Sequence, residues 1–205
     1  MYYPYYNIQV DQPKPIPAFV LKTPPAREPL DVVDVKSHSR IDINDDDLLI
    51  QWHIAAVRKK IEKEYNLALI TQTWTMYFDF LPMTCIEIPK RPVQSITSVK
   101  YLDGNNQLQT LDPLTYKVDL NSRPPRIVRW YNSTWPYVIP QPSAIAVEFI
   151  AGYGDKPSDI PEDIQKGHLA YIGSFYENRE TYTEQTIQPV DFLQTLFNSE
   201  RFFSV

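Results

Sequence analysis

The residues that could do chemistry in this chain are few and scattered. Its three histidines, His38, His53 and His168, stand singly on predicted helices, where a histidine is more often a face or core residue than a ligand or a base. The three consecutive aspartates Asp45 to Asp47 have the side chains of a metal site but not its geometry, because neighbouring residues at a helix start point in different directions. Helix capping explains them fully. The sequence therefore predicts no catalytic residue, no metal and no cofactor.

Motif searches lead to the same expectation. The chain has no G-x-S-x-G elbow, P-loop, G-x-G-x-x-G or H-E-x-x-H. Its 25 acidic residues offer carboxylate pairs, but no spacing among them favours glycoside hydrolysis. The single cysteine, Cys85, excludes an internal disulfide and a thiolate metal site. It lies in the strand-like stretch TCIEI, and we expect a buried structural thiol.

One stretch could bind a ligand without catalysis. Aromatic and basic residues alternate there, and they could form a stacking platform for single-stranded nucleic acid or for a sugar. The alternative is aromatic packing beneath a proline-rich crossover. The residues concerned are Arg126, Arg129, Trp130, Tyr131, Trp135 and Tyr137.

Length and composition indicate one globular domain with appendages. The chain has 205 residues, 43% of them hydrophobic, and no apolar run long enough to span a bilayer. The first residues do not resemble a secretory signal, so we expect the protein to stay where it is made. A net charge of −5 argues mildly against a nucleic-acid-binding protein. Nineteen prolines against five glycines indicate stiff arms and crossovers rather than flexible linkers.

Residues 1–28 are predicted to form an extended N-terminal arm. They show no periodicity long enough to build a core, and four tyrosines surround Pro4. Either this segment is a disordered leader, or its aromatic residues bury themselves on a neighbouring subunit.

Helices are predicted over residues 31–39, 45–65 and 161–179, and Val190 to Phe197 suggest a short final helix. Asp31 and Asp34 can form a capping box at the start of the first of these helices. The second helix carries two adjoining apolar faces, which together predict a broad buried stripe. These faces are Leu49, Trp52, Ala56 and Lys60, and Ile50, Ile54, Val57 and Ile61.

The run ALITQTW (Ala68–Trp74) marks the junction between a helical layer and a β layer, because the apolar period changes from helical to two after it. Trp74, Met76 and Phe78 should point to one side of the first strand. Further strands are predicted at 84–88, 95–102, 107–111, 116–120, 127–131 and 145–151, within a β block over residues 71–151. The predicted fold class is α+β, a helical bundle of N- and C-terminal helices with an inserted antiparallel β block.

Several segments, in this order, resemble the head–tail connector (adaptor, or head completion) proteins of tailed bacteriophages. The resemblance covers about residues 29–197, which would form the connector domain, leaving 198–205 as a C-terminal tail. It rests on joint order and spacing rather than on any single motif. The segments are EPLDVVDVKSHSRI (28–41), DDDLLIQWHIAAVRKKIE (45–62), ALITQTW (68–74), SITSVKYLDGNNQLQTL (95–111), YKVDL (116–120), PPRI (124–127), VEFIAGYGD (147–155) and IPEDIQKGHLAYIGSFYENRE (160–180).

This resemblance implies a structural virion protein, assembled in the host cytoplasm and located in the neck. Such proteins form a ring, commonly dodecameric, beneath the portal protein; the ring extends the DNA channel and supports the next neck or tail protein. DNA would pass through without specific binding, and no membrane is involved. The N-terminal arm and the passage Trp135–Pro142 are longer than the family pattern. The resemblance therefore does not predict which subunit contacts these two segments make.

The candidate contacts to the portal or to other subunits are apolar residues near the two ends of the chain. The C-terminal group docks on the portal in one hypothesis and closes the domain's own core in the other. The candidates are Tyr2, Tyr3, Tyr5, Tyr6, Phe192, Leu193, Leu196, Phe197, Phe202 and Phe203.

Overall fold

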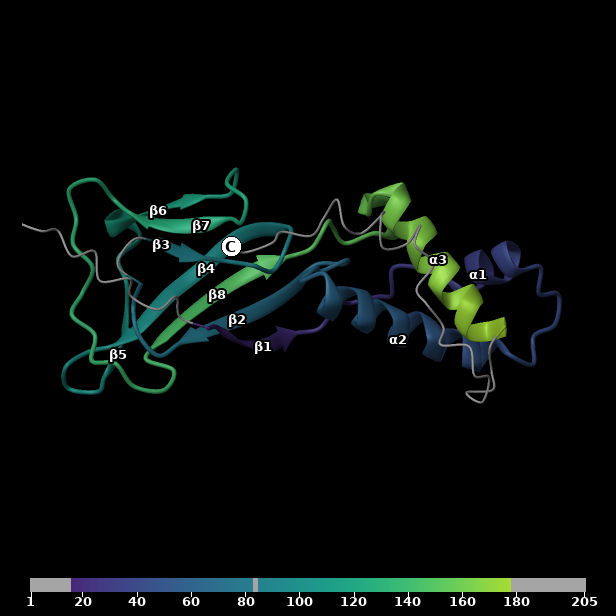
Figure 1. Ribbon diagram of the computed structural model, residues 1–205, viewed down its shortest axis with the longest axis horizontal. Coiled ribbons are helices and arrows are strands. Elements are labelled where there is room, and N and C mark those ends of the chain that lie inside the picture. The colour runs from purple at the N-terminus through teal and green to yellow at the C-terminus, as the bar shows by residue number, and fades with distance from the viewer. Residues whose placement is uncertain (1–15, 83–84, 178–205) are drawn as a thin grey trace, which may run out of the picture.

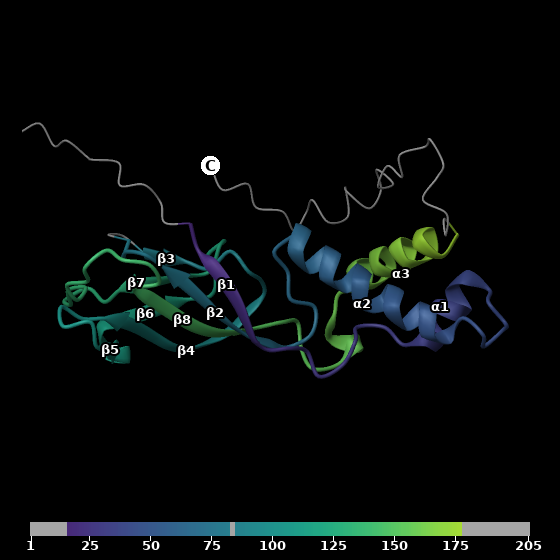
Figure 2. The same cartoon turned by 90° about the horizontal axis from the view of Figure 1, so that it is seen from below.

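The protein is elongated, with strands gathered at one end and helices at the other (Figures 1 and 2). The computed structural model describes residues 16–82 and 85–177. Within them the fold is mixed α and β, with three α-helices and two antiparallel sheets. The predicted short helix near residues 190–197 lies outside the described residues.

The three helices pack against one another around a common apolar core. They are α1 (Val32–Ser39), α2 (Asp47–Glu64) and α3 (Glu162–Glu177). The predicted capping at α1 is confirmed, since the Asp34 carboxylate accepts a hydrogen bond from the Asp31 N–H at 3.1 Å. Val35, Ile54 and Ile172 are among the core residues. None of the helices described combines the length and the apolar character that crossing a bilayer requires.

The larger sheet has five strands in the order β1-β2-β8-β4-β5, and the smaller has three in the order β3-β7-β6. The register of β2 with β8 places Met76 opposite Val147 and Trp74 opposite Phe149, which confirms the predicted inward face. Ile86 and Ile127 of the smaller sheet complete this second core. The strands are β1 (Ala18–Thr23), β2 (Gln72–Phe78), β3 (Cys85–Glu87), β4 (Val93–Leu102), β5 (Leu108–Thr110), β6 (Tyr116–Asp119), β7 (Arg126–Arg129) and β8 (Ile145–Ala151).

The segment between α2 and β2 joins the two cores, as the sequence predicted. Leu67, Leu69 and Ile70 are buried in the helical core, whereas Ala68 is buried in the core between the sheets. The Ala68 N–H donates to the Arg91 carbonyl at 2.7 Å, which ties the segment to the chain entering β4. Both halves of the molecule therefore depend on this short buried stretch.

Strand β1 was not expected, because residues 1–28 showed no strand pattern. It adds to the edge of the larger sheet by pairing with β2, with Phe19 opposite Met76 and Val20 opposite Thr75. An edge strand buries little side-chain surface, and only Phe19 of β1 packs onto the core. The alternating pattern that identifies a strand in a sequence is consequently absent. Residues 1–15 lie outside the described part, so the predicted arm stays a prediction.

The broad apolar stripe predicted for α2 is wrong in one half. Ile50, Ile54, Val57 and Ile61 are buried as expected. On the adjoining face Trp52, Ala56 and Lys60 are exposed and Leu49 is half-buried. Phe175 of α3 is likewise exposed, although it follows the buried Tyr171 and Ile172 at helical spacing. Helices α1 and α3 cover one side of α2, and no other described element covers its opposite side.

Candidate functional site

The residues with catalytic potential do not come together in the structure. His168 is buried on α3 with Nε2 3.3 Å from the Ile54 carbonyl oxygen, whereas His38 is exposed on α1. His53 lies beside Phe175, with 6.1 Å between the ring centroids. Among the described residues no group of three or more histidine, cysteine or acidic side chains could hold a metal ion.

Two of these side chains are better explained by structure than by reactivity. Burial lowers the pKa of His168 to about 4, so the ring is neutral at physiological pH, as expected for a core histidine. Cys85 is half-buried in β3 rather than fully buried, because that strand lies at the edge of the smaller sheet.

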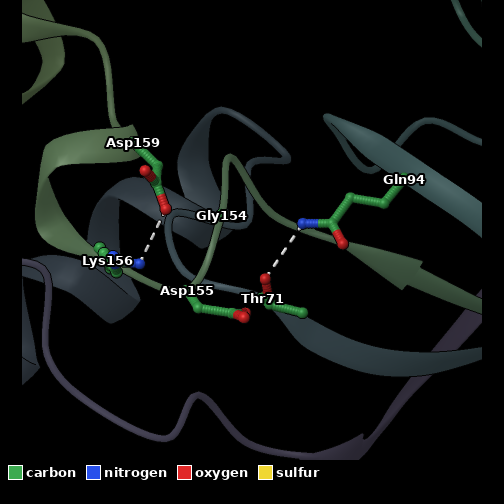
Figure 3. Close-up of a pocket in the computed structure, with 6 residues that line it drawn as sticks. All are labelled: Thr71, Gln94, Gly154, Asp155, Lys156 and Asp159. Carbon is green, nitrogen blue, oxygen red and sulfur yellow. Dashed lines mark hydrogen bonds between the residues drawn. The ribbon is translucent and has the colours of Figure 1, made fainter.

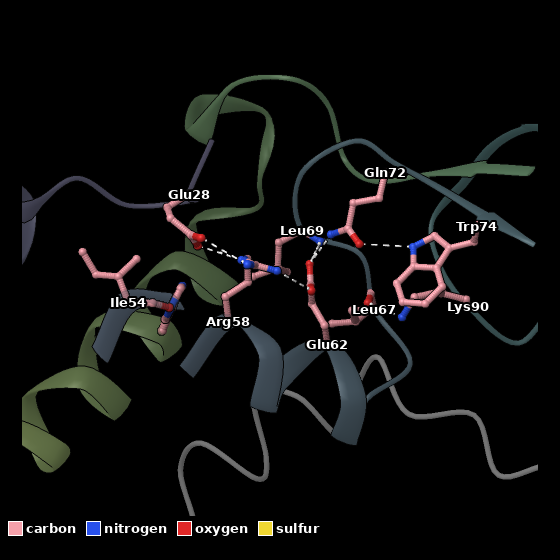
Figure 4. A network of polar contacts seen from close by, with 10 residues as sticks. Glu28, Ile54, Arg58, Glu62, Leu67, Leu69, Gln72, Trp74 and Lys90 are labelled. Carbon is pink, nitrogen blue, oxygen red and sulfur yellow. Dashed lines mark hydrogen bonds and ion pairs between the residues drawn. The ribbon is translucent and has the colours of Figure 1, made fainter. Parts of the chain in front are cut away.

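The main polar feature is a buried network where the helices meet the larger sheet (Figure 4). The Arg58 guanidinium contacts Glu28 at 2.7 Å and Glu62 at 3.0 Å. Glu62 also accepts hydrogen bonds from the Leu69 N–H at 3.0 Å and from the Gln72 amide at 2.6 Å. One carboxylate of α2 thus satisfies donors from the junction segment and from β2.

Sequence reasoning missed this network. A basic residue in the second half of a helix normally complements the helix dipole and faces water, so Arg58 was not expected to be buried. The available signal was the i, i+4 spacing of Arg58 and Glu62, which flank the buried Ile61.

Lys90 continues the network toward the second core. Its ammonium donates to the Leu67 carbonyl at 2.9 Å and lies 4.3 Å from the centre of the Trp74 ring. Burial lowers the pKa of Lys90 to about 8, and the negative charge of Glu62 partly offsets the effect. A buried lysine of this kind can act as a nucleophile. In this structure the Lys90 ammonium instead stabilises the junction, through its hydrogen bond to the Leu67 carbonyl and its contact with the Trp74 ring.

A small polar cavity of about 340 Å³ opens on the same junction (Figure 3). The Gln94 amide donates to Thr71 Oγ1 at 3.0 Å and to the Gly152 carbonyl at 2.8 Å. Asp159 accepts from the Lys156 N–H at 2.9 Å. These polar groups bind one another, and their hydrogen bonds hold the chain between β8 and α3 in place. The lining of the cavity is therefore typical of a structural junction rather than of a ligand site.

The predicted aromatic platform does not form as one surface. Trp135 packs against the core between the sheets, in agreement with the structural alternative. Tyr131 is 94% exposed and Tyr137 is also exposed. Trp130 is partly exposed, with the Lys117 ammonium 6.0 Å from its ring centre. Only part of the set is therefore available to a partner.

None of the candidate contacts predicted near the chain ends can be placed, since all ten lie outside the described residues. Within the described part, exposed apolar and aromatic side chains lie on the helices, on β1 and in the β block. A surface of this kind is characteristic of protein–protein contacts.

The fold itself matches solved structures of particle necks. A chain from the neck of an empty gene transfer agent (GTA) particle, determined with C6 symmetry, superposes with a TM-score of 0.77 at 18% identity, covering 92% of this chain and 97% of that one. This chain has the fold of a neck protein. A chain from the neck of the native GTA particle, determined with C12 symmetry, gives a TM-score of 0.72 at 18% identity, with 93% and 97% covered.

A third chain, from the virion of the native GTA particle, agrees with a TM-score of 0.75 at 17% identity over 91% and 96% of the two chains. No family model and no curated protein sequence matches this chain. The resemblance inferred from ordered sequence segments is confirmed at the level of the fold.

Proposed function

We propose that the protein is a structural component of a virion neck, where it forms a ring below the portal, joins the head to the tail and extends the DNA channel. The supporting observation is the fold likeness to neck proteins over more than nine-tenths of both chains. A match of that extent includes both the helices and the sheets, so the two proteins share the whole domain rather than a common motif.

The proposed ring is homo-oligomeric and contains twelve copies, in agreement with the C12 symmetry of one similar neck. In this role the chain acts as a bundle of N- and C-terminal helices with an inserted antiparallel β block, and different faces meet the portal, the next neck or tail protein and adjacent subunits. A ring needs two different faces on each subunit. Assembly takes place in the host cytoplasm.

Native mass spectrometry of the full chain, with and without the portal protein, tests this function. The expected result is a closed ring of one stoichiometry that binds the portal. A chain that stays monomeric alone and in the presence of the portal would refute it.

The C-terminal contact is a separate part of the proposal. Deletion of residues 189–205 should abolish portal binding and leave the thermal unfolding transition of the described domain in place. Retained binding would assign those residues to the domain's own packing instead. Replacing Tyr2, Tyr3, Tyr5 and Tyr6 by serine tests the N-terminal arm in the same assay.

A second candidate is a binding module for nucleic acid or glycan that uses Trp130 and Tyr131. Two observations favour it: Tyr131 is exposed next to Trp130 in the sequence, and the Lys117 ammonium lies 6.0 Å from the centre of the Trp130 ring. Trp130→Ala discriminates the two functions: loss of ligand affinity with intact assembly supports the module, and loss of assembly supports the connector. Trp135→Ala, at the packed position, is the comparison variant for folding.

A further inference from the structure

The face of α2 that no described element covers carries two different kinds of side chain along one line. Leu48, Trp52, Lys59 and Lys63 follow one another at intervals of four, seven and four residues, which places all four on one side of a helix. Leu48 is 58% and Trp52 64% exposed. An exposed tryptophan next to a leucine is costly in water and is typical of a contact surface. We call these four residues the α2 face.

A second apolar surface lies on α1 and on the loop that connects it to α2. Val33 is 74% and Ile43 55% exposed. Asp34, Asp42 and Asp45 are exposed around them. From residue 31 to residue 47 the chain has six acidic and two basic side chains, so this surface is negative. We call these five residues the α1 face; the loop lies at the end of the molecule away from the sheets (Figure 1).

Both faces are exposed, whereas other residues of the same two helices are buried in the shared core. Helix α2 turns Ile50 and Ile54 toward that core, and α1 turns Val35 toward it. The residues of the α2 face lie on the side of that helix opposite Ile50 and Ile54. In the α1 face, Val33 and Asp34 are exposed on α1, and the other three residues lie in the loop that follows it. The two faces therefore belong to different segments of one subunit, and a heterologous contact joins two different patches of this kind.

Their chemistry is complementary. Each face presents two apolar side chains next to charged ones, and the charges are positive on the α2 face and negative on the α1 face. Complementary charges fix the register of a contact and disfavour wrong pairings, while the apolar anchors contribute its affinity. We propose that the α2 face of one subunit packs against the α1 face of a second copy of this chain. This inference rests on the proposed ring and specifies its repeated contact.

Charge reversal on each face gives a direct test. Lys59→Glu/Lys63→Glu makes both faces of a subunit negative, and Asp42→Lys/Asp45→Lys makes both positive. Each variant alone should lose closed rings by at least about tenfold, measured by native mass spectrometry in the presence of the portal protein. All four positions are exposed, so both variants should keep the thermal unfolding transition of the wild type. Lys166→Glu, at an exposed position of α3, is the matched control and should assemble normally.

Mixing the two variants provides the decisive result. In an alternating ring every contact again joins a positive face to a negative one, so an equimolar mixture should restore closed rings that contain equal numbers of the two variants. If the variants assemble alone, or if the mixture fails to restore rings, the inference is wrong while the neck function stands. If the wild type forms no ring with the portal, the proposed function fails, and the inference fails with it.

Discussion

Individual residues matter most where the backbone passes close to itself. Gly152 ends β8 with φ at 144°, a conformation that residues with a side chain rarely adopt. A Cβ there would lie 2.6 Å from the Thr71 Cα, in the segment that leaves the junction. The Gly152 N–H donates to the Pro92 carbonyl at 2.9 Å, so the site cannot shift without losing a contact of the junction.

Gly152→Ala should therefore destabilise the fold by about 2–4 kcal/mol, since it combines a strained conformation with a steric clash. Gly104→Ala is the control, because a Cβ at Gly104 would meet nothing within 4 Å. That variant should cost less than about 1 kcal/mol. Urea denaturation of the two variants measures the difference, and equal losses would contradict the close approach at Gly152.

His168 links stability to pH. Its pKa is lowered by burial to about 4, below the ordinary value of 6.5. Between these values the unfolded chain binds the proton and the folded chain does not, so the contribution is complete above pH 6.5 and is lost as the pH falls toward 4. Across that window the group should account for on the order of 3 kcal/mol of unfolding free energy.

The pH dependence can be tested by substitution. His168→Gln should flatten the dependence of the unfolding free energy on pH between 4 and 6.5, whatever its effect on absolute stability. His38→Gln, at an exposed position, should keep the slope of the wild type. An unchanged slope in the His168 variant would show that other groups cause the acid sensitivity.

At the scale of elements, α2 is the helix on which the rest of the molecule depends. One side of it packs on α1 and α3, and its last turn holds the junction through Glu62. The apolar period predicted that helix and one of its faces correctly. It could not predict that Arg58 and Glu62 are buried, because their partners Glu28 and Gln72 are distant in the sequence and become neighbours only in the fold.

Glu62→Ala should destabilise the protein by about 3–5 kcal/mol, because it leaves the Leu69 N–H and the Gln72 amide without their acceptor and removes one of the two carboxylates that pair with Arg58. Glu64→Ala is the matched control two residues away. Glu64 contacts Lys60 at 3.7 Å on the surface, and a pair of that kind contributes less than about 1 kcal/mol. Thermal and urea unfolding measure both, and a small loss at Glu62 would show that the network adds little to the junction.

At the scale of the whole molecule, two cores in line make an elongated block. The buried junction stretch and the Glu62 network connect the cores. The net charge of −5 and the acidic end of the helical half mean that a ring of such blocks has no general attraction for phosphate.

If the proposed ring forms, it should accordingly bind duplex DNA weakly, with a dissociation constant above about 1 µM at physiological salt. Filter binding over a range of salt concentrations measures this. A sub-micromolar affinity that falls steeply with salt would show that the channel wall holds DNA through its phosphates, contrary to a channel through which DNA slides.

The sequence by itself determined the local structure. Capping by Asp31 and Asp34, the buried face of α2 with Ile50 and Ile54, and the alternation in β2 are all fixed by near neighbours, and the structure confirms them. The order of these segments was also enough to indicate the fold of a neck protein.

The tertiary structure alone decided which apolar faces find a partner within the chain. Ile54 and Trp52 are both apolar positions of one helix, yet Ile54 is buried by α3 and Trp52 faces solvent. Periodicity reports that a face is apolar, whereas burial depends on which distant segment reaches it. For the same reason β1 could not be predicted from the sequence. This edge strand is held by its backbone pairing with β2 and has no alternating side-chain pattern of its own.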